Sequence, residues 1–217
     1  MCREILPLFF IFRHFVYFCR MKEETEHDVV KEHIVKVSKE VFRRYGLSKV
    51  SMDDLSKAAG KGRSTLYHYF KNKKEVFEAC VLSELSVIMH EASLKLQKKA
   101  GTSYNLHIYY STKLGGIIAL KNQYQNLLED LRLQPEIFGR LSKILMEEET
   151  FALQQLLKWG IADNEIAPMD EGELVFLSNA LVTAFRSFEM EMALQDKVED
   201  LENRLSWLIN ILYKGLK

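Results

Sequence analysis

The stretch SMDDLSKAAGKGRSTLYHYF, residues 51–70, decides the fold of this chain. Ser51 and Asp54 have the spacing of a capping box, which starts a helix, and a glycine-containing turn follows that helix. Beyond the turn, Leu66 and Phe70 lie four residues apart and therefore share one face of a second helix. Two short helices joined by a glycine turn predict a helix-turn-helix.

The polar residues of the second helix have the chemistry that contacts with DNA require. A helix-turn-helix lays its first helix across the DNA backbone and points the N-terminal residues of its second helix at base edges. Arg63 can make a bidentate contact to guanine, and Ser64 and Thr65 can reach base edges or phosphates. Phosphate contacts are expected from Tyr67, Lys71 and Lys73. The alternative is a helical hairpin with a purely structural role.

Charge is distributed unevenly along the chain. Its 30 Lys and Arg balance 30 Asp and Glu, so the net charge is zero. Residues 43–74 hold nine basic and two acidic residues, a net charge of +7, whereas residues 129–217 hold nine basic and seventeen acidic residues, a net charge of −8. Because clustered Lys and Arg neutralise phosphates, this pattern predicts that only the basic segment meets a polyanion. The alternative is a solvated charged surface.

The composition favours an all-α fold and excludes several classes of protein. Three prolines and ten glycines among 217 residues are too few for the turns of a β-sandwich or a doubly wound α/β fold. The three cysteines form no CxxC pair and the six histidines show no paired metal spacing, so we expect no disulfide framework, metal or cofactor. GxSxG, HExxH, P-loop and GxGxxG motifs are also lacking, so we do not expect an enzyme.

Helix-period apolar spacing with capping signals predicts about nine helices after residue 25. The expected helices cover residues 25–46, 51–59, 63–70, 72–101, two stretches within 103–133, then 135–159, 170–192 and 196–212. The boundary inside 103–133 is expected near Gly115-Gly116 or near Asn122, and a loop is expected at 160–169.

Residues 1–20 differ in composition from the rest of the chain. Residues 6–18 are mostly apolar, but these 13 residues fall short of the roughly 20 that span a bilayer, and no small-residue cleavage site follows them. We expect translation to begin at Met21, so that residues 1–20 are not part of the native protein. A weak interfacial anchor or an apolar tail is the alternative.

Residues 27 to about 78 resemble the N-terminal DNA-binding domain of TetR-family transcriptional regulators. In that family, a Phe-x-x-x-Gly-like stretch precedes a helix that starts with Ser or Thr, then Ala-Gly, a variable turn, Thr-Leu-Tyr-x-Tyr-Phe and Lys-x-Glu. The corresponding residues here are Phe42 to Gly46, Ser51 to Leu55, Ala58-Ala59-Gly60, Thr65 to Phe70 and Lys73-Lys74-Glu75. The family often has Val-Ser where this chain has Lys61-Gly62, so glycine replaces a side-chain cap, a change that bears on base preference rather than on the fold.

The resemblance implies a role for each matching residue. The scaffold residues would be Leu55, Ala58, Gly60, Leu66 and Phe70. The phosphate contacts would be Ser51, Tyr67 and Lys73. The residues that read the operator would be Arg63, Ser64, Thr65 and His68.

The resemblance also implies a DNA-binding domain at residues 25–78 and a helical effector-binding and dimerisation domain at residues 79–217. A weaker likeness at 159–166 matches a loop that the family has before its two-helix dimerisation hairpin. A cavity between helices is a usual place for a small molecule. The residues that could line it, each of them alternatively an ordinary core or surface residue, are Tyr104, His107, Tyr110, Tyr124, Met146, Trp159 and Arg186.

Apolar residues recur at steps of three and four in the last two expected helices, so these helices can form a hairpin that pairs with a second copy. The expected dimer interface consists of Leu174, Leu177, Leu181, Phe188, Val198, Leu201, Leu205, Leu208 and Leu212. Alternatively, both rows of apolar residues belong to the internal core.

Together, the residues and the resemblance predict a homodimeric repressor that a small-molecule effector releases from a palindromic operator. It would act in the bacterial cytoplasm at the nucleoid, without stable membrane insertion. One alternative is a DNA-bound structural or adaptor protein that uses the same fold without repressing transcription. Another is a membrane-tethered regulator that retains residues 1–20.

Overall fold

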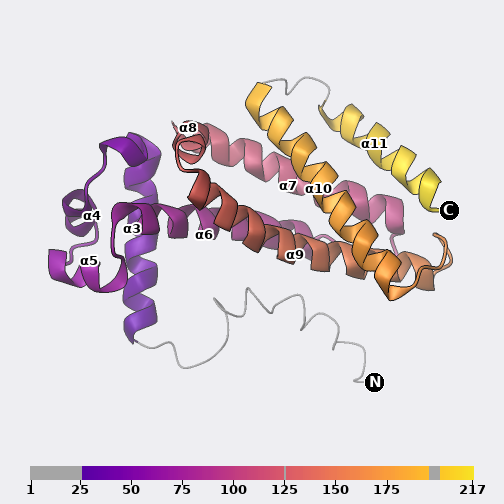
Figure 1. Ribbon diagram of the computed structural model, residues 1–217, viewed down its shortest axis with the longest axis horizontal. Coiled ribbons are helices and arrows are strands. Elements are labelled where there is room, and N and C mark those ends of the chain that lie inside the picture. The colour runs from indigo at the N-terminus through magenta and orange to yellow at the C-terminus, as the bar shows by residue number, and fades with distance from the viewer. Residues whose placement is uncertain (1–25, 125, 196–200) are drawn as a thin grey trace. The chain divides into compact units, whose positions relative to one another are not determined.

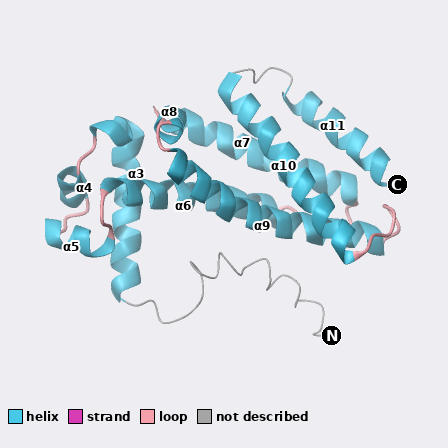
Figure 2. Ribbon diagram, viewed as in Figure 1, coloured by secondary structure: helices cyan, strands magenta, loops and turns pink. Residues whose placement is uncertain are grey.

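The computed structural model describes residues 26–124, 126–195 and 201–217, and every regular element in these ranges is a helix (Figures 1 and 2). The helices are α3 (Glu26–Lys49), α4 (Met52–Ala58), α5 (Arg63–Tyr69), α6 (Lys73–Leu94), α7 (Thr102–Gln123), α8 (Leu127–Arg132), α9 (Pro135–Ala162), α10 (Glu171–Gln195) and α11 (Leu201–Leu216). The all-α prediction is therefore confirmed for the described part of the chain. The expected leader at residues 1–20 lies outside it.

Several helix boundaries differ from those expected; α9, for example, continues to Ala162, inside the loop expected at 160–169. The backbone turns at Gly46 (φ 72°, ψ 171°), as the glycine predicts, but helical hydrogen bonding resumes and α3 continues to Lys49. Helix α6 ends at Leu94, several residues before Gly101. Gly115 and Gly116 lie inside α7, so the break near Asn122 is the correct one of the two alternatives. Backbone hydrogen bonding determines where these helices end, and the periodicity of apolar residues in the sequence does not reveal those hydrogen bonds.

The described residues form two compact units. The head unit comprises residues 26–86 and 119–142, and the body unit comprises residues 87–118 and 143–217. The head unit thus contains α8 and the adjoining ends of α7 and α9 in addition to the segment that the sequence predicts as a DNA-binding domain. Each unit is described separately below.

Each unit has an apolar core. In the head unit, Phe42 of α3 and Phe77 of α6 are each 1% exposed, and their rings meet edge to face with centroids 5.3 Å apart. In the body unit, Tyr110 of α7 stacks on Phe185 of α10 with a centroid separation of 3.6 Å. Most of the stability of helices in a protein comes from burying such large side chains and not from the intrinsic helix propensity of the residues.

Candidate nucleic-acid interface

The first helix of the motif begins at a complete capping box. The Ser51 hydroxyl accepts a hydrogen bond from the Asp54 backbone N–H at 3.2 Å, and an Asp54 carboxylate oxygen accepts one from the Ser51 backbone N–H at 2.9 Å. These bonds satisfy two of the N–H groups that a helix start leaves without partners. The Ser51 hydroxyl also donates a hydrogen bond to an Asp54 carboxylate oxygen at 2.6 Å. This bond, followed by the one from the Ser51 N–H, lowers the pKa of Asp54 because both favour the ionised carboxylate. The predicted start of α4 is confirmed.

Apolar side chains dock the motif in the head unit as the sequence predicts, with one correction. Leu55 and Leu66 are fully buried, and Phe70 is 4% exposed. Ala58, predicted to be scaffold, is exposed, whereas its neighbour Ala59 is buried. The reason is that α4 ends at Ala58, so the backbone turns Ala59 inward as the C-terminal cap.

A histidine outside the motif also holds the turn in place. The His33 side chain on α3 lies with its Nε2 atom 3.1 Å from the Ala59 carbonyl oxygen, as a hydrogen-bond donor. Sequence reasoning missed this contact because the two residues are 26 positions apart. Gly60, which follows, has φ 59° and open space around its Cα, so the predicted glycine turn is present.

The second helix presents most of its predicted DNA-contacting residues to solvent. Arg63, Ser64, Tyr67 and His68 are exposed and Thr65 is half-buried, whereas Leu66 alone faces the core. Helix α5 begins after Gly62 without a side-chain cap, so its first N–H groups have no such partner. Backbone N–H groups at a helix start and the hydroxyl and guanidinium side chains beside them are groups that bind phosphates and base edges.

Arg63 lies beside an acidic residue that sequence reasoning did not single out. Its Nε atom is 3.2 Å from a carboxylate oxygen of Asp53, and its guanidinium lies over the Tyr67 ring, 5.6 Å from the centroid. The Tyr67 hydroxyl, followed by Asp53, raises the pKa of Arg63, so the guanidinium stays charged. Both members of the ion pair are more than half exposed, so DNA can compete for Arg63 at small cost.

His68 points partly toward its own chain. Its ring meets the His27 ring edge to face, with centroids 5.6 Å apart, and the Tyr69 ring at 5.2 Å. It is nevertheless exposed. The His68 side chain thus already contacts α3, and its role in reading bases remains a prediction.

The two lysines that follow α5 have different environments. Lys71 is exposed, which suits its predicted contact with a phosphate. The Lys73 ammonium donates hydrogen bonds to the carbonyl oxygens of Leu47 at 2.8 Å, Ser48 at 3.1 Å and Val50 at 2.7 Å. An ammonium has three N–H donors, so these bonds account for all of them. The expected phosphate contact of Lys73 is therefore replaced by an internal role.

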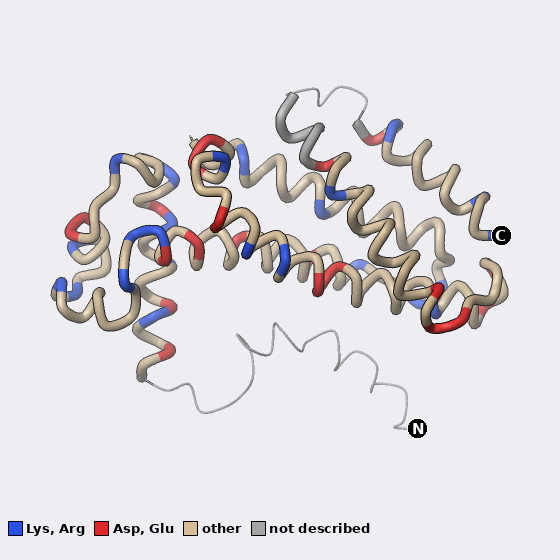
Figure 3. The backbone as a smooth tube through the Cα atoms, viewed as in Figure 1, with Lys and Arg blue, Asp and Glu red and all other residues tan. Residues whose placement is uncertain are grey.

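Basic residues surround the motif. Figure 3 shows Lys and Arg in blue along α4, α5, the end of α3 and the start of α6, with few acidic residues among them. Two of those acidic residues, Asp53 and Asp54, are already engaged by Arg63 and Ser51. The positive potential of this surface suits a phosphate backbone.

The residues predicted to line an effector pocket belong to both units. Tyr124 belongs to the head unit, where its hydroxyl donates to a carboxylate oxygen of Glu84 at 3.2 Å, whereas the other six belong to the body unit. Among those six, Tyr104 is 47% exposed and Tyr110 is fully buried in the core.

The remaining predicted pocket residues lie at intermediate depth in the body unit. His107 contacts the Ser206 hydroxyl through its Nε2 atom at 2.9 Å, which ties α7 to α11. Met146, Trp159 and Arg186 are half-buried. Their role in effector binding remains a prediction.

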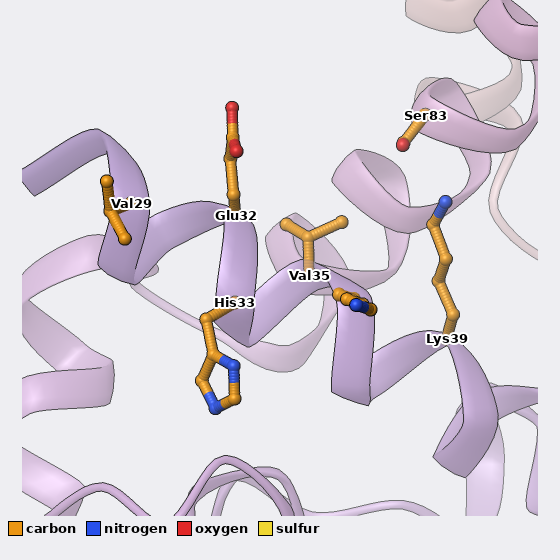
Figure 4. A pocket seen from close by; sticks show the side chains of 7 residues that line it. Val29, Glu32, His33, Val35, Lys39 and Ser83 are labelled. Atoms are coloured by element: carbon orange, nitrogen blue, oxygen red, sulfur yellow. The ribbon is translucent and has the colours of Figure 1, made fainter. Parts of the chain in front are cut away.

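The head unit has an open hollow on α3 and α6 (Figure 4). The residues that line it are Val29, Glu32, His33, Val35, Lys36, Lys39 and Ser83. None of them was predicted to bind an effector. Figure 4 shows Glu32 and His33 pointing in opposite directions.

Three of the nine predicted dimer residues are buried inside their own chain. Leu174, Leu181 and Leu205 are 3%, 6% and 2% exposed, so they are core residues and not an interface with a second copy. Phe188 packs against Leu114 of α7. Leu177, Leu208 and Leu212 are half-buried, Val198 lies outside the described residues, and the side chain of Leu201 is not described. The alternative that these rows form internal core is correct for the three leucines.

A capped first helix, a glycine turn and an exposed second helix in basic surroundings define a helix-turn-helix DNA-binding protein. The model of the family "Bacterial regulatory proteins, tetR family" matches residues 34–80. The Transposon Tn10 TetC protein of Escherichia coli is 28% identical over 149 residues, which are 68% of this chain and 74% of that protein. The HTH-type transcriptional regulator AcrR of Shigella flexneri is 34% identical over 79 residues, 36% of each chain.

Solved structures agree on the fold. A TetR-family transcriptional regulator from Pectobacterium atrosepticum has a TM-score of 0.67 at 17% identity, over 88% of this chain and 95% of its own. A transcriptional regulator from Cytophaga hutchinsonii has a TM-score of 0.65 at 20% identity, over 85% and 97%. Residues 34–80 thus match the tetR-type DNA-binding domain, and this chain is a DNA-binding transcriptional regulator whose relatives are regulators and not enzymes.

Two further properties concern the described residues. No helix within 26–124, 126–195 and 201–217 combines the length and hydropathy that a membrane crossing requires. In the same part of the chain, no group of three or more His, Cys, Asp or Glu side chains is arranged to hold a metal ion. The thiol of Cys80 is buried, which raises its pKa to about 12, so it is not a reactive thiolate.

Proposed function

We propose that this regulator is a homodimeric repressor that a small-molecule effector releases from a palindromic operator at the bacterial nucleoid. The observation that carries the DNA-reading part is the exposure of Arg63, Ser64 and Tyr67 at the start of α5, above a core-facing Leu66. In this proposal residues 25–78 form the DNA-binding domain, and residues 79–217 bind the effector and the second copy. Ser51, Thr65, His68 and Lys71 complete the contact surface.

The operator can be found by selecting DNA duplexes from genomic fragments with the purified chain. Two heads about one helical turn apart, roughly 34–36 Å, would read two half-sites of a palindrome in successive major grooves. A short palindrome next to a promoter supports the repressor. Enrichment of many dispersed, non-palindromic sites would instead support a structural or adaptor role.

Replacing Arg63 and replacing Lys71 should change DNA binding in different ways. We expect Arg63→Ala to relax preference at one base pair of each half-site by about 1–3 kcal/mol, because a bidentate guanine contact is lost. We expect Lys71→Met to weaken binding to all sequences and to lower the slope of log K against log salt by about 0.9, because one phosphate contact is lost. Titrations with selected and scrambled duplexes measure both effects. Equal loss on both duplexes for Arg63→Ala would contradict its role as a reader.

Large apolar side chains exposed on the last two helices support a dimer. Phe176 of α10 is 76% exposed, and Trp207 and Ile211 of α11 are 66% and 47% exposed. Trp207 and Ile211 are four residues apart and so share one face of α11. Phe176 and the exposed Ala180 share one face of α10 in the same way. Exposed aromatic residues of this kind are typical of protein interfaces. We therefore assign the dimer contact to these outward faces.

The variant Trp207→Asp should convert the dimer to a monomer. A buried aromatic anchor of an interface contributes about 2 kcal/mol or more, and a carboxylate in its place adds a desolvation penalty. Light scattering with size-exclusion chromatography measures the mass. Asn122→Asp adds the same charge at an exposed polar position of α7, outside α10 and α11, and serves as the control. A monomeric wild-type chain, or a dimeric Trp207→Asp variant, would contradict this assignment.

Release by an effector requires a difference in affinity between two conformations. A shift from 99:1 to 1:99 in the operator-competent population needs a preference of about 10⁴, or roughly 5.5 kcal/mol. The residues proposed to contribute are those of the body unit, namely Tyr104, His107, Tyr110, Met146, Trp159 and Arg186. Compounds related to the products of genes beside the selected operator are the ones to test for release of the labelled duplex.

A further inference from the structure

The turn that leads from α3 into the helix-turn-helix is held by two residues outside the motif. Gly46 adopts φ 72° and ψ 171°, and a Cβ atom there would lie 3.0 Å from the Asn126 amide nitrogen and 3.1 Å from an Asp130 carboxylate oxygen. The absence of a side chain at Gly46 therefore allows α8 to approach the backbone of the turn. Asp130 uses this approach to contact the next residue.

Asp130 makes a single short contact with the turn. One of its carboxylate oxygens accepts a hydrogen bond from the Leu47 backbone N–H at 2.7 Å, and both residues are buried. Burial raises the pKa of Asp130, while the Leu47 hydrogen bond and the charge of Lys73 act in the opposite direction. Hydrogen bonds to a buried, charged acceptor are among the stronger ones in proteins.

Lys73 holds the same turn from the other direction. Its ammonium donates hydrogen bonds to three carbonyl oxygens, those of Leu47, Ser48 and Val50, at 2.7–3.1 Å. Val50 directly precedes Ser51, the cap of α4. The backbone between α3 and the motif thus has its Leu47 N–H and three of its carbonyls fixed by side chains from α8 and α6. We call Asp130, Lys73 and residues 46–50 the turn clamp.

We propose that Asp130 and Lys73 are positioning residues for DNA recognition. They set the angle of α4 and α5 against α3 by fixing the backbone of residues 46–50. The inference rests on DNA binding by the helix-turn-helix. Asp130 lies sixty residues beyond Phe70, the end of the motif, on a helix that no DNA contact requires. A recognition helix must place several side chains on base edges at once, so a small change of angle weakens all of these contacts.

The sign of the charge effect separates positioning from general electrostatics. Removing a carboxylate should strengthen binding to a polyanion if only charge matters. We expect the opposite for Asp130→Ala: at least a tenfold loss of affinity for the duplex that the wild-type chain selects. Its slope of log K against log salt should stay unchanged, because no phosphate contact is lost. Asp130→Asn keeps an acceptor for the Leu47 N–H and should restore most of the affinity.

Matched controls exist on the same helices. Glu129→Ala removes an exposed carboxylate next to Asp130 without touching the turn, so we expect unchanged or slightly tighter binding. Lys73→Met should lower affinity with an unchanged salt slope, in contrast to a phosphate-contacting lysine, whose loss lowers the slope by about 0.9. Lys74→Met, at an exposed neighbouring lysine, controls for general loss of positive charge.

Hydrogen exchange provides a readout that does not involve DNA. In the folded Asp130→Ala chain, the peptide containing Leu47 should exchange its amide hydrogen at least tenfold faster than in the wild-type and Glu129→Ala chains. Equal affinity and equal exchange for Asp130→Ala and Glu129→Ala would overturn the proposal. A lowered salt slope for Lys73→Met would overturn the part assigned to Lys73. If the wild-type chain selects no duplex, the proposed DNA binding itself is contradicted. If the wild-type chain selects a duplex and the variants bind it with wild-type affinity, only the role of the turn clamp is contradicted.

Discussion

Lys113→Met should destabilise the body unit more than any other single substitution considered for this chain. The Lys113 ammonium lies 2.6 Å from a Glu149 carboxylate oxygen and 2.9 Å from one of Glu189. These three side chains are 4%, 0% and 7% exposed and join α7, α9 and α10. Removing the only ammonium of this trio leaves the buried Glu149 and Glu189 carboxylates without the ion-pair partner that they share. We expect a loss of about 3–5 kcal/mol.

Thermal unfolding at pH 8 measures this effect, since this pH lies above the raised pKa of Glu189, about 7. A loss of that size lowers Tm by roughly 6–20 °C in a chain of this length. Lys143→Met replaces an exposed lysine of α9 and should change stability by no more than about 0.5 kcal/mol. Equal Tm values for the two variants would show that the buried trio does not depend on Lys113.

A triple variant separates the charge effect from a packing effect. Lys113→Met combined with Glu149→Gln and Glu189→Gln removes all three charges and keeps the side-chain volumes similar. Replacing a complete buried ion cluster is often neutral or stabilising. We therefore expect the triple variant to recover most of the stability that Lys113→Met loses. Continued instability would assign the loss to packing.

Wild-type stability should fall as the pH rises from about 4.5 to 7. Burial raises the pKa of Glu189 from its ordinary 4.5 to about 7; Glu149 raises it further, while Lys113 and Arg186 lower it. Between these two pH values the folded chain holds a proton that the unfolded chain has released, so each step upward in pH favours unfolding. The total loss is about 3 kcal/mol, complete above pH 7 and absent below 4.5.

Glu189→Gln should abolish most of this pH dependence, because an amide of the same shape cannot ionise. Its Tm at pH 8 should exceed that of the wild-type chain, and its Tm at pH 5 should be close to the wild-type value. Glu147→Gln, at an exposed position of α9, should leave the wild-type profile unchanged. A Glu189→Gln chain with the wild-type profile would place the titrating group elsewhere.

Local features of the motif were predictable from the sequence. The capping box of Ser51 and Asp54 joins residues three positions apart, so spacing is enough to identify it. The buried positions Leu55 and Leu66 follow from helix periodicity, which relates residues on one face. In such cases both partners of an interaction lie within one or two turns of the same helix.

Contacts between distant segments were not predictable. The bond between the Leu47 N–H and Asp130 joins residues 83 positions apart, and no pattern near either residue signals it. A lysine in a basic segment suggests a phosphate contact, but Lys73 has three carbonyl partners supplied by the fold. Likewise, periodicity places Leu174 and Leu181 on one face of α10 without showing whether that face meets its own chain or a second copy.

The three carbonyl contacts of Lys73 also affect its chemical reactivity. An amine-labelling reagent must approach a nitrogen whose three hydrogens point into the protein backbone, whereas Lys71 and Lys74 on either side are exposed. Lysine footprinting of the folded chain should therefore label Lys71 and Lys74 first and Lys73 last. An acetyl group on Lys73 would remove the charge and fill the space of the turn, so modification there would switch off the head without touching the recognition helix.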